Sequence, residues 1–309
     1  MLLEINIWHP IMALIQLEPI SKIRKYFQLA RLNNWIKNLI IFSPLFFAGR
    51  ISNTVLLQQS LISFISFSFL TSSIYILNDY MDLEHDRAHP SKKNRPLASG
   101  KIPIAHAGAM AIVLLIVGLG IISQLSIDTF YVSLSYVVIM TAYCLVFRKM
   151  ALVDIGIIAT GFVIRLYVGS TVTGIPNSMW IIIMTFLLAL FITLAKRRDD
   201  LRMLAINDEN TRESLNGYSI TLVDSLIIVL VPIIIVSYIL YCTADENITR
   251  VGNNLYLTSV FVFFGFMRYL QLIFVKNLGG DPMGLLFRDS GIQLVLFFWI
   301  SSFAWILYF

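Results

Sequence analysis

The sequence is poor in charged residues and in cysteine. Charged residues make up 13% of the 309 residues, about half the share found in a soluble domain, whereas 58% are hydrophobic and the mean hydropathy is +0.79. The two cysteines, Cys144 and Cys242, lie inside apolar runs. This excludes a disulfide or metal framework built on cysteine and predicts two small core residues. A net charge of only +5 gives nucleic-acid binding no support.

Apolar runs of membrane-spanning length recur along most of the chain, bounded by polar or charged stretches. They predict nine transmembrane helices, near 37–52, 56–78, 104–124, 129–147, 152–172, 178–195, 221–242, 254–274 and 290–308. We therefore expect an all-α, polytopic membrane protein. Residues 31–309 are expected to form one transmembrane catalytic domain, and residues 1–30 a cytoplasmic or interfacial segment.

Basic residues are distributed unevenly between the predicted loops. If the N-terminus is cytoplasmic, most of the 23 Lys and Arg residues lie on the inside of the membrane. Only Arg50 and Arg250 fall in outside loops, and Arg165 and Arg268 fall within spans. By the positive-inside rule, this predicts a protein of the cell (inner or plasma) membrane with a cytoplasmic N-terminus and an outside C-terminus. The long charged loops 79–103 and 196–220 then make the cytoplasmic face the place for chemistry.

An acid-rich segment directly follows the second predicted span. Its polar side chains are those of Asn78, Asp79, Asp82 and Asp86. On a helix, carboxylates three and four residues apart share one face, while Glu84 and His85 point elsewhere. Carboxylates held together repel one another unless a cation joins them, and Mg²⁺ binds one or two carboxylates together with water and phosphate oxygens. We expect the four residues to be magnesium ligands and the three aspartates to be catalytic; a solvated helix end is the alternative.

Basic residues stand near these acids in two places. Lys92 and Arg95 lie in a stretch that two prolines keep out of a regular helix. Lys196, Arg197 and Asp200 follow the sixth predicted span. Acids that hold a metal, beside bases that hold phosphate, make a diphosphate site, so we expect all five to bind substrate. Simple positive-inside topology is the alternative for the bases.

Arg165 lies within a predicted span, where a cation is costly and usually faces the interior of a helix bundle. We expect it to bind phosphate or ribose deep in the pocket. A structural ion pair is the alternative, since Asp154 lies about three turns earlier on the same helix. Arg198, by contrast, is expected to face solvent or lipid headgroups.

These residues resemble the UbiA-type prenyltransferase superfamily, whose motif Asn-Asp-x-x-Asp-x-x-x-Asp matches residues 78–86 in full. Five stretches resemble one branch, the phosphoribosyltransferases that act on decaprenyl phosphate: 31–38, 78–100, 143–180, 196–201 and 281–289. The chain departs from the branch at Asp200, where glutamate is usual. It also lacks the second Asp-x-x-x-Asp motif that many members using a prenyl diphosphate carry.

The resemblance implies nine helices around a central cavity that opens at the cytoplasmic face. It implies Mg²⁺-dependent transfer of 5-phosphoribosyl from phosphoribosyl diphosphate to a polyprenyl phosphate, with the lipid bilayer holding the apolar tail. Lys37, at the entrance of the first span, is expected to present the lipid phosphate. One alternative is a prenyltransferase with a prenyl diphosphate donor and a small aromatic acceptor. Another is a transporter that binds an anionic solute at Arg165, against which the three aligned carboxylates argue.

Overall fold

The computed structural model describes residues 18–88, 92–207, 215 and 217–308, and within them every regular element is a helix. Eight helices are long and apolar enough to cross a membrane, so the protein is a multi-pass membrane protein. They are α4 (Thr54–Met81), α6 (Ile104–Leu125), α7 (Ile127–Leu145), α8 (Val153–Thr173), α9 (Met179–Asn207), α10 (Ile220–Thr243), α12 (Ser259–Phe274, preceded by η5, Leu255–Thr258) and α14 (Ser290–Tyr308).

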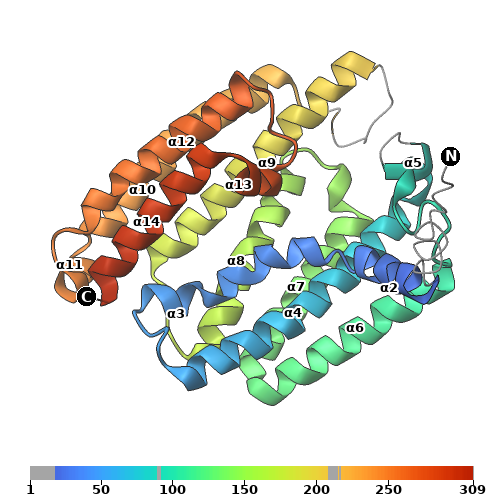
Figure 1. Cartoon of the computed structure of the whole chain (residues 1–309), viewed down its shortest axis with the longest axis horizontal. Coiled ribbons are helices and arrows are strands. Elements are labelled where there is room, and N and C mark those ends of the chain that lie inside the picture. Colours follow the sequence, from blue (N-terminus) through green and yellow to red (C-terminus); the bar gives the residue numbers. More distant parts are fainter. Residues whose placement is uncertain (1–17, 89–91, 208–214, 216, 309) are drawn as a thin grey trace, which may run out of the picture.

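The first of the nine expected spans is not one continuous α-helix. It consists of the 3₁₀ helix η1 (Leu32–Phe42) and the short helix α3 (Ser43–Phe47). Pro44 stands in the first turn of α3, where proline is tolerated because its missing N–H has no partner there. Among the described residues the count of long spanning helices is therefore eight, with a broken ninth segment that packs against α4 and α8 (Figure 1).

Two glycines bring these elements unusually close together. A Cβ atom on Gly169 of α8 would lie 2.0 Å from the Ile41 carbonyl oxygen in η1. One on Gly118 of α6 would lie 2.8 Å from the Ser66 carbonyl oxygen in α4. Small residues of this kind let helices pack backbone to backbone in membranes.

The helices form two groups that meet between α8 and α9 (Figure 1). In the first group η1, α4, α6, α7 and α8 share a core around Ile41, Phe67 and Tyr136. In the second, α9, α10 and α12 pack around Phe191 and Ile273. Cys144 and Cys242 are buried and free, as the sequence predicts.

Short helices lie at the ends of the bundle. One end, called the polar end below, is where α4 finishes and α8 begins. It carries α2 (Glu18–Leu29), α5 (Leu83–Ala88), η2 (Lys92–Asn94), η3 (Phe147–Lys149) and α13 (Pro282–Arg288). Helix α11 (Asp245–Val251) follows the far end of α10, at the opposite end of the bundle (Figure 1). The N-terminal segment expected at 1–30 is described only from residue 18.

Helix α9 continues well past the expected end of its span at residue 195. It runs to Asn207, so Lys196, Arg197 and Asp200 are helical rather than part of a loop. Hydropathy marks where the apolar run ends, and here the helix extends into the polar end.

Candidate functional site

The three aspartates of the acidic motif are buried at the polar end. Asp79, Asp82 and Asp86 are 4%, 8% and 4% exposed. Asp79 lies in the last turn of α4, Asp82 caps that helix, and Asp86 lies in α5. Glu84 and His85 are exposed, as the helical spacing predicts.

Arginines from three different segments neutralise these carboxylates. Arg31, at the start of η1, pairs with Asp79, and Arg148 of η3 pairs with Asp82. Arg95 contacts two aspartates through one nitrogen, Nη1, which lies 3.2 Å from Asp79 Oδ1 and 2.5 Å from Asp86 Oδ2. A buried carboxylate needs a partner of this kind.

Arg31 and Arg148 were not among the site residues that the sequence indicates. Arg31 and Asp79 are 48 positions apart in the sequence, and Arg148 and Asp82 are 66 positions apart. Pairs this distant leave no periodic pattern in the sequence from which they could be predicted. Arg31 also has a left-handed backbone, with φ of 52°. A non-glycine residue in this region is strained by about 1–3 kcal/mol and needs its surroundings to hold it there.

The acidic cluster fits a divalent cation in its donor chemistry. Within the described part of the chain no three His, Cys, Asp or Glu side chains stand close enough to form a metal site by themselves. Magnesium, however, needs only one or two carboxylates when water and phosphate supply the other oxygens. Because Arg95 Nη1 contacts both Asp79 and Asp86, a single cation can reach both carboxylates. The side-chain amide of Asn78 donates to Asp82 Oδ2 at 3.0 Å, so Asn78 lies in the same cluster.

Arg165 is buried within α8, with 5% of its surface exposed. It donates to neutral acceptors: Asn38 Oδ1 at 2.7 Å, the Gly161 carbonyl oxygen at 2.7 Å and the Tyr136 hydroxyl at 3.1 Å. None of the salt bridges found among the described residues includes it. The structural ion pair considered for Arg165 is therefore absent from that part of the chain.

Asp154 instead forms an ion pair with Arg197 across the junction of α8 and α9. The Arg197 Nη2 atom lies 2.5 Å from Asp154 Oδ2, with both side chains almost fully buried. The Tyr218 hydroxyl donates to Asp154 Oδ1 at 2.7 Å and accepts from the Leu152 backbone N–H at 2.8 Å. Burial, followed by the hydrogen bond to Asp154, raises the pKa of Tyr218, so this hydroxyl stays a donor at physiological pH.

The other predicted cations and Asp200 have different environments. Lys92 is half-buried in η2, while Lys196 is exposed on α9. Asp200 is partly exposed and accepts from Arg197 Nη1 at 3.4 Å. The expectation for Arg198 is wrong: it is 9% exposed and donates to Asp224 and to the Ile273 carbonyl oxygen at 2.6 and 3.1 Å.

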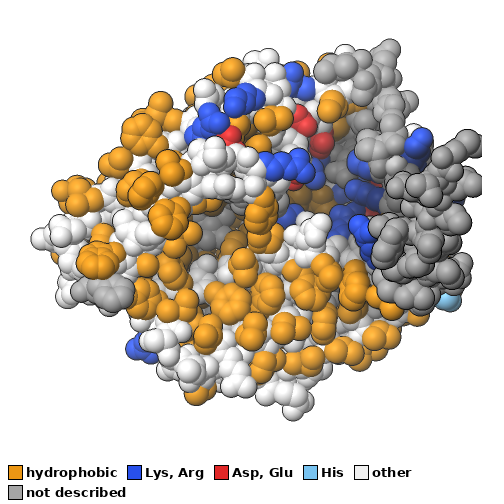
Figure 2. Space-filling view, viewed as in Figure 1, with side chains coloured by type: hydrophobic (Ala, Val, Ile, Leu, Met, Phe, Trp, Pro, Cys, Tyr) orange, Lys and Arg blue, Asp and Glu red, His pale blue; other side chains and the backbone are white. Residues whose placement is uncertain are grey.

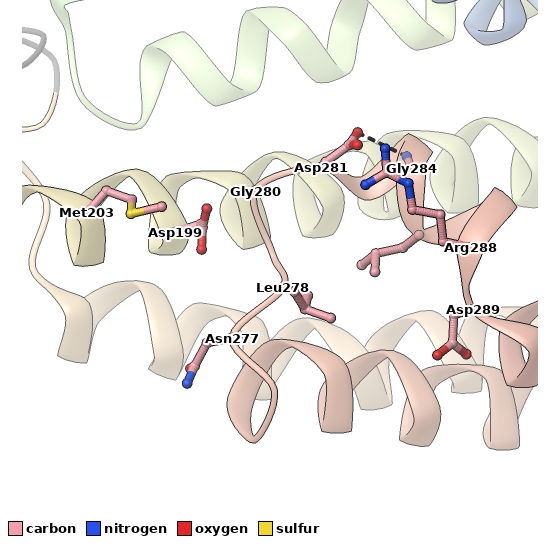
Figure 3. Close-up of a pocket in the computed structure, with 10 residues that line it drawn as sticks. Asp199, Met203, Asn277, Leu278, Gly280, Asp281, Gly284, Arg288 and Asp289 are labelled. Carbon is pink, nitrogen blue, oxygen red and sulfur yellow. Dashed lines mark hydrogen bonds between the residues drawn. The ribbon is translucent and has the colours of Figure 1, made fainter. Parts of the chain in front are cut away.

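A separate pocket lies where the end of α9 meets the segment before α13 (Figure 3). It has a volume of about 390 Å³, and its lining includes Asp199, Asn277, Asp281 and Arg288. Asp281 accepts from the Gly284 N–H at 2.9 Å and so begins α13. Asp289 pairs with Arg268, and this hydrogen bond lowers the pKa of Asp289 to about 2. None of the acidic-motif residues lines this pocket.

The long-range pairs bring residues of every long charged segment to the polar end. Asp82 meets Arg148, Asp154 meets Arg197, and Arg198 lies 3.5 Å from Asn277 through Nη1 and Oδ1. Lys and Arg side chains gather around a recess at this end, while hydrophobic side chains are spread over the left and lower parts of the visible face (Figure 2). An apolar belt with one strongly charged end is the surface that a membrane-embedded site requires.

Membership of a known family follows from the sequence match. Residues 39–208 match the family model described as the UbiA prenyltransferase family, and the chain belongs to this family. The fold is similar to the "UbiA homolog from Archaeoglobus fulgidus bound to DMAPP and Mg2+", with a TM-score of 0.69 and 18% identity over 92% of this chain and 99% of that chain. At this identity the likeness concerns the fold.

Two curated relatives cover most of the chain. The decaprenyl-phosphate phosphoribosyltransferase of Mycobacterium tuberculosis is 27% identical over 88% of this chain and 90% of that protein. The protein of the same name from Corynebacterium glutamicum is 26% identical over 87% of this chain and 82% of that protein.

Proposed function

We propose that this protein transfers the 5-phosphoribosyl group from phosphoribosyl diphosphate to a polyprenyl phosphate, with Mg²⁺ as cofactor and release of diphosphate. The observation that carries the proposal is the convergence of Arg31, Arg95 and Arg148 on the acidic motif. Such a site offers both carboxylates for a metal and guanidinium groups for phosphate oxygens. The similarity to the two phosphoribosyltransferases, which covers most of this chain and of each relative, supports this choice of substrates.

The acidic cluster would bind the diphosphate end of the donor. Asn78, Asp79, Asp82 and Asp86 are the residues to hold Mg²⁺, which supplies positive charge against the diphosphate as it leaves. Arg95 contacts two of these aspartates, so it lies where it can exchange a carboxylate for a phosphate oxygen. Guanidinium groups suit this role because they bind phosphate in a bidentate manner.

The remaining predicted residues would surround the rest of the substrates. Lys92 and Lys196 supply additional cations for the donor's phosphates. The Arg197 guanidinium lies between Asp154 and Asp200. The two ion pairs fix Arg197 at the junction of α8 and α9, with Asp200 beside it. The one-methylene difference between Asp200 and the glutamate usual in the branch is small enough for a water molecule to bridge.

The reaction is a displacement at C1 of the ribose. An oxygen of the lipid phosphate forms the new bond to C1, and the bond from C1 to the diphosphate oxygen breaks. The diphosphate leaves with the electron pair. Because the attacking lipid phosphate is already anionic, the site needs no strong general base. The acid-rich cluster acts on the leaving group, where negative charge develops.

The polar end would face the cytoplasm, with the N-terminus inside and the C-terminus outside the cell membrane. The support is the positive-inside rule together with the meeting of the charged segments at one end of the bundle. In this arrangement residues 31–309 act as a single catalytic domain, since the two helix groups share α8. Phosphoribosyl diphosphate is soluble and reaches the site from the polar end, while the polyprenyl tail stays among the apolar helices.

The competing function is transfer of a prenyl group from a prenyl diphosphate to a small aromatic acceptor. Side-by-side assays of the purified protein with both donor and acceptor pairs separate the two. We expect diphosphate release with phosphoribosyl diphosphate and polyprenyl phosphate only. Release with a prenyl diphosphate and an aromatic acceptor, and none with the first pair, would overturn the proposal.

A further inference from the structure

Tyr75 lies on the face of α4 that carries the acidic motif, one helical turn before Asp79. The Cζ atom of Arg31 lies 5.1 Å from the centre of the Tyr75 ring, and the same guanidinium pairs with Asp79. Arg31 thus connects the tyrosine to the acidic cluster. One turn places Tyr75 about 5.4 Å farther into the membrane than Asp79.

The surroundings of the Tyr75 hydroxyl are cationic. Lys37 of η1 lies next to it, and the charges of Arg165 and Arg31 act on it as well. Arg31 has an aspartate partner. Lys37 and Arg165, in contrast, take part in none of the salt bridges found among the described residues, and the three hydrogen bonds of Arg165 go to neutral acceptors.

The charge balance therefore differs between two levels of the site. At the level of Asp79, three arginines face three aspartates. Deeper in the membrane, Lys37 and Arg165 contribute two positive charges with no carboxylate partner in the described chain. Lys37 lies beside Tyr75, and Arg165 lies near Phe67 and, through Asn38, near Thr71, one to two turns below Tyr75. An unneutralised cation at membrane depth is unfavourable, and residues of this kind mark binding sites for anions.

Helix η1 holds this deeper level in a fixed geometry. The Asn38 side-chain amide donates to Ser68 Oγ at 2.9 Å and to Thr71 Oγ1 at 3.3 Å, and its oxygen accepts from Arg165. Trp35 Nε1 donates to Ser72 Oγ at 3.0 Å. These bonds fasten the backbone on both sides of Lys37 to α4, so the ammonium group is positioned before a ligand arrives. Preorganised charge of this kind lowers the cost of binding.

We propose that Lys37, Tyr75 and Arg165 form the binding site for the phosphate monoester of the lipid acceptor. This inference rests on the proposed function and adds Tyr75 to it as a substrate-binding residue. A phosphate monoester carries close to two negative charges at neutral pH, which matches the two cations that have no carboxylate partner among the described residues. The Tyr75 hydroxyl donates a hydrogen bond to one of its oxygens. A phosphate held one turn below the acidic cluster faces C1 of a ribose whose diphosphate lies at that cluster.

The 5-phosphate of the donor is the other phosphate monoester in this reaction. The position of the site favours the lipid, because Tyr75 lies on the membrane side of the acidic motif. A phosphate anchored to a polyprenyl chain approaches from that side, whereas a soluble sugar phosphate approaches from the polar end.

The test measures binding and turnover separately in Tyr75→Phe and Lys37→Gln, using the purified full-length protein in lipid nanodiscs. Binding of a polyprenyl phosphate is measured without donor, next to the corresponding neutral polyprenol and ribose 5-phosphate. KM is then measured for both substrates. Tyr80→Phe is the matched control, since Tyr80 lies on the same helix but is 50% exposed. Lys37→Arg tests whether charge alone restores the site.

We expect each variant to bind the polyprenyl phosphate roughly tenfold more weakly, as for the loss of one charge-assisted hydrogen bond. Its KM for the lipid rises equally, while polyprenol binding and the KM for phosphoribosyl diphosphate stay unchanged. Unaltered lipid phosphate binding, or a selective loss of ribose 5-phosphate binding, would overturn the assignment.

If the wild type binds polyprenyl phosphate in a Tyr75-dependent manner but transfers nothing, the lipid site stands and the proposed function fails. If the wild type transfers phosphoribosyl and both variants keep its lipid affinity, the proposed function stands and the assignment of the lipid site fails.

Discussion

Arg148 and Asp82 form an ion pair at the polar end, although 66 residues and two transmembrane helices separate them in the sequence. Asp82 is 8% exposed, and η3 brings Arg148 to it from the connection between α7 and α8. The pair links the acidic motif to a segment outside it. It also places a guanidinium group where the diphosphate of the donor would lie.

Arg148→Gln tests whether this arginine serves the donor. We expect kcat/KM for phosphoribosyl diphosphate to fall about 10- to 100-fold, because a charged hydrogen bond of about 1.5–3 kcal/mol is lost. The KM for polyprenyl phosphate should change little. Arg250→Gln, at the opposite end of the bundle, is the control. If kcat/KM for phosphoribosyl diphosphate is the same in the two variants, Arg148 does not bind the donor.

Asp82→Asn tests the acidic cluster itself. The change keeps the shape of the side chain but removes the charge that holds Arg148 and would hold a metal. We expect turnover to be abolished while expression and membrane insertion remain normal, as judged by a turnover assay and by the yield of monodisperse protein. Near-normal turnover would show that the cluster is not part of the mechanism.

Asp154→Asn tests the buried pair that joins α8 to α9. Removing the carboxylate leaves Arg197 buried with only the partly exposed Asp200 as an acidic partner. We expect a loss of roughly 3–5 kcal/mol in stability, the cost typical of breaking a buried ion pair. Thermal unfolding in detergent measures the change. The double variant Asp154→Asn/Arg197→Met should regain part of the stability, because it no longer buries an uncompensated charge; a double variant as unstable as the single one would contradict this explanation.

Gly169→Ala tests how closely η1 must pack against α8. The added methyl group would lie 2.0 Å from the Ile41 carbonyl oxygen, so η1 has to move, at a cost of about 1–3 kcal/mol. Gly156→Ala is the matched control on the same helix, since nothing lies within 4 Å of its added Cβ. We expect a lower unfolding temperature for the first variant alone. A similar result for both would mean that the contact between η1 and α8 is not tight.

The parts of the site that follow from local spacing could be predicted from the sequence. The helical spacing of 79, 82 and 86 predicts that these carboxylates gather on one side, and they do so although α4 ends at Met81 and Asp86 lies in α5. The exposure of Glu84 and His85 follows from the same spacing. The spanning helices also follow from apolar runs. The structure differs where a polar interaction overrides hydropathy, as at η1, where Asn38 and Trp35 bond to α4 and Pro44 starts a new helix.

The partners of the aspartates could not be predicted in the same way. Arg31 and Arg148 look like ordinary inside-facing cations, because a positive-inside loop and a phosphate site both require basic residues. Arg197 was expected to face substrate, but the structure surrounds it with Asp154 and Asp200. A single sequence carries no signal for such long-range pairs, which depend on how α8 and α9 pack.

The central claim is the transfer of phosphoribosyl to a lipid phosphate, and one measurement tests it most directly. Purified protein in liposomes is given phosphoribosyl diphosphate labelled in the ribose, a polyprenyl phosphate and Mg²⁺, and the lipid fraction is counted. The account predicts lipid-linked label that requires both the polyprenyl phosphate and Mg²⁺ and is absent with Asp82→Asn. No lipid-linked label from the wild type, while it transfers a prenyl group from a prenyl diphosphate, would contradict the account.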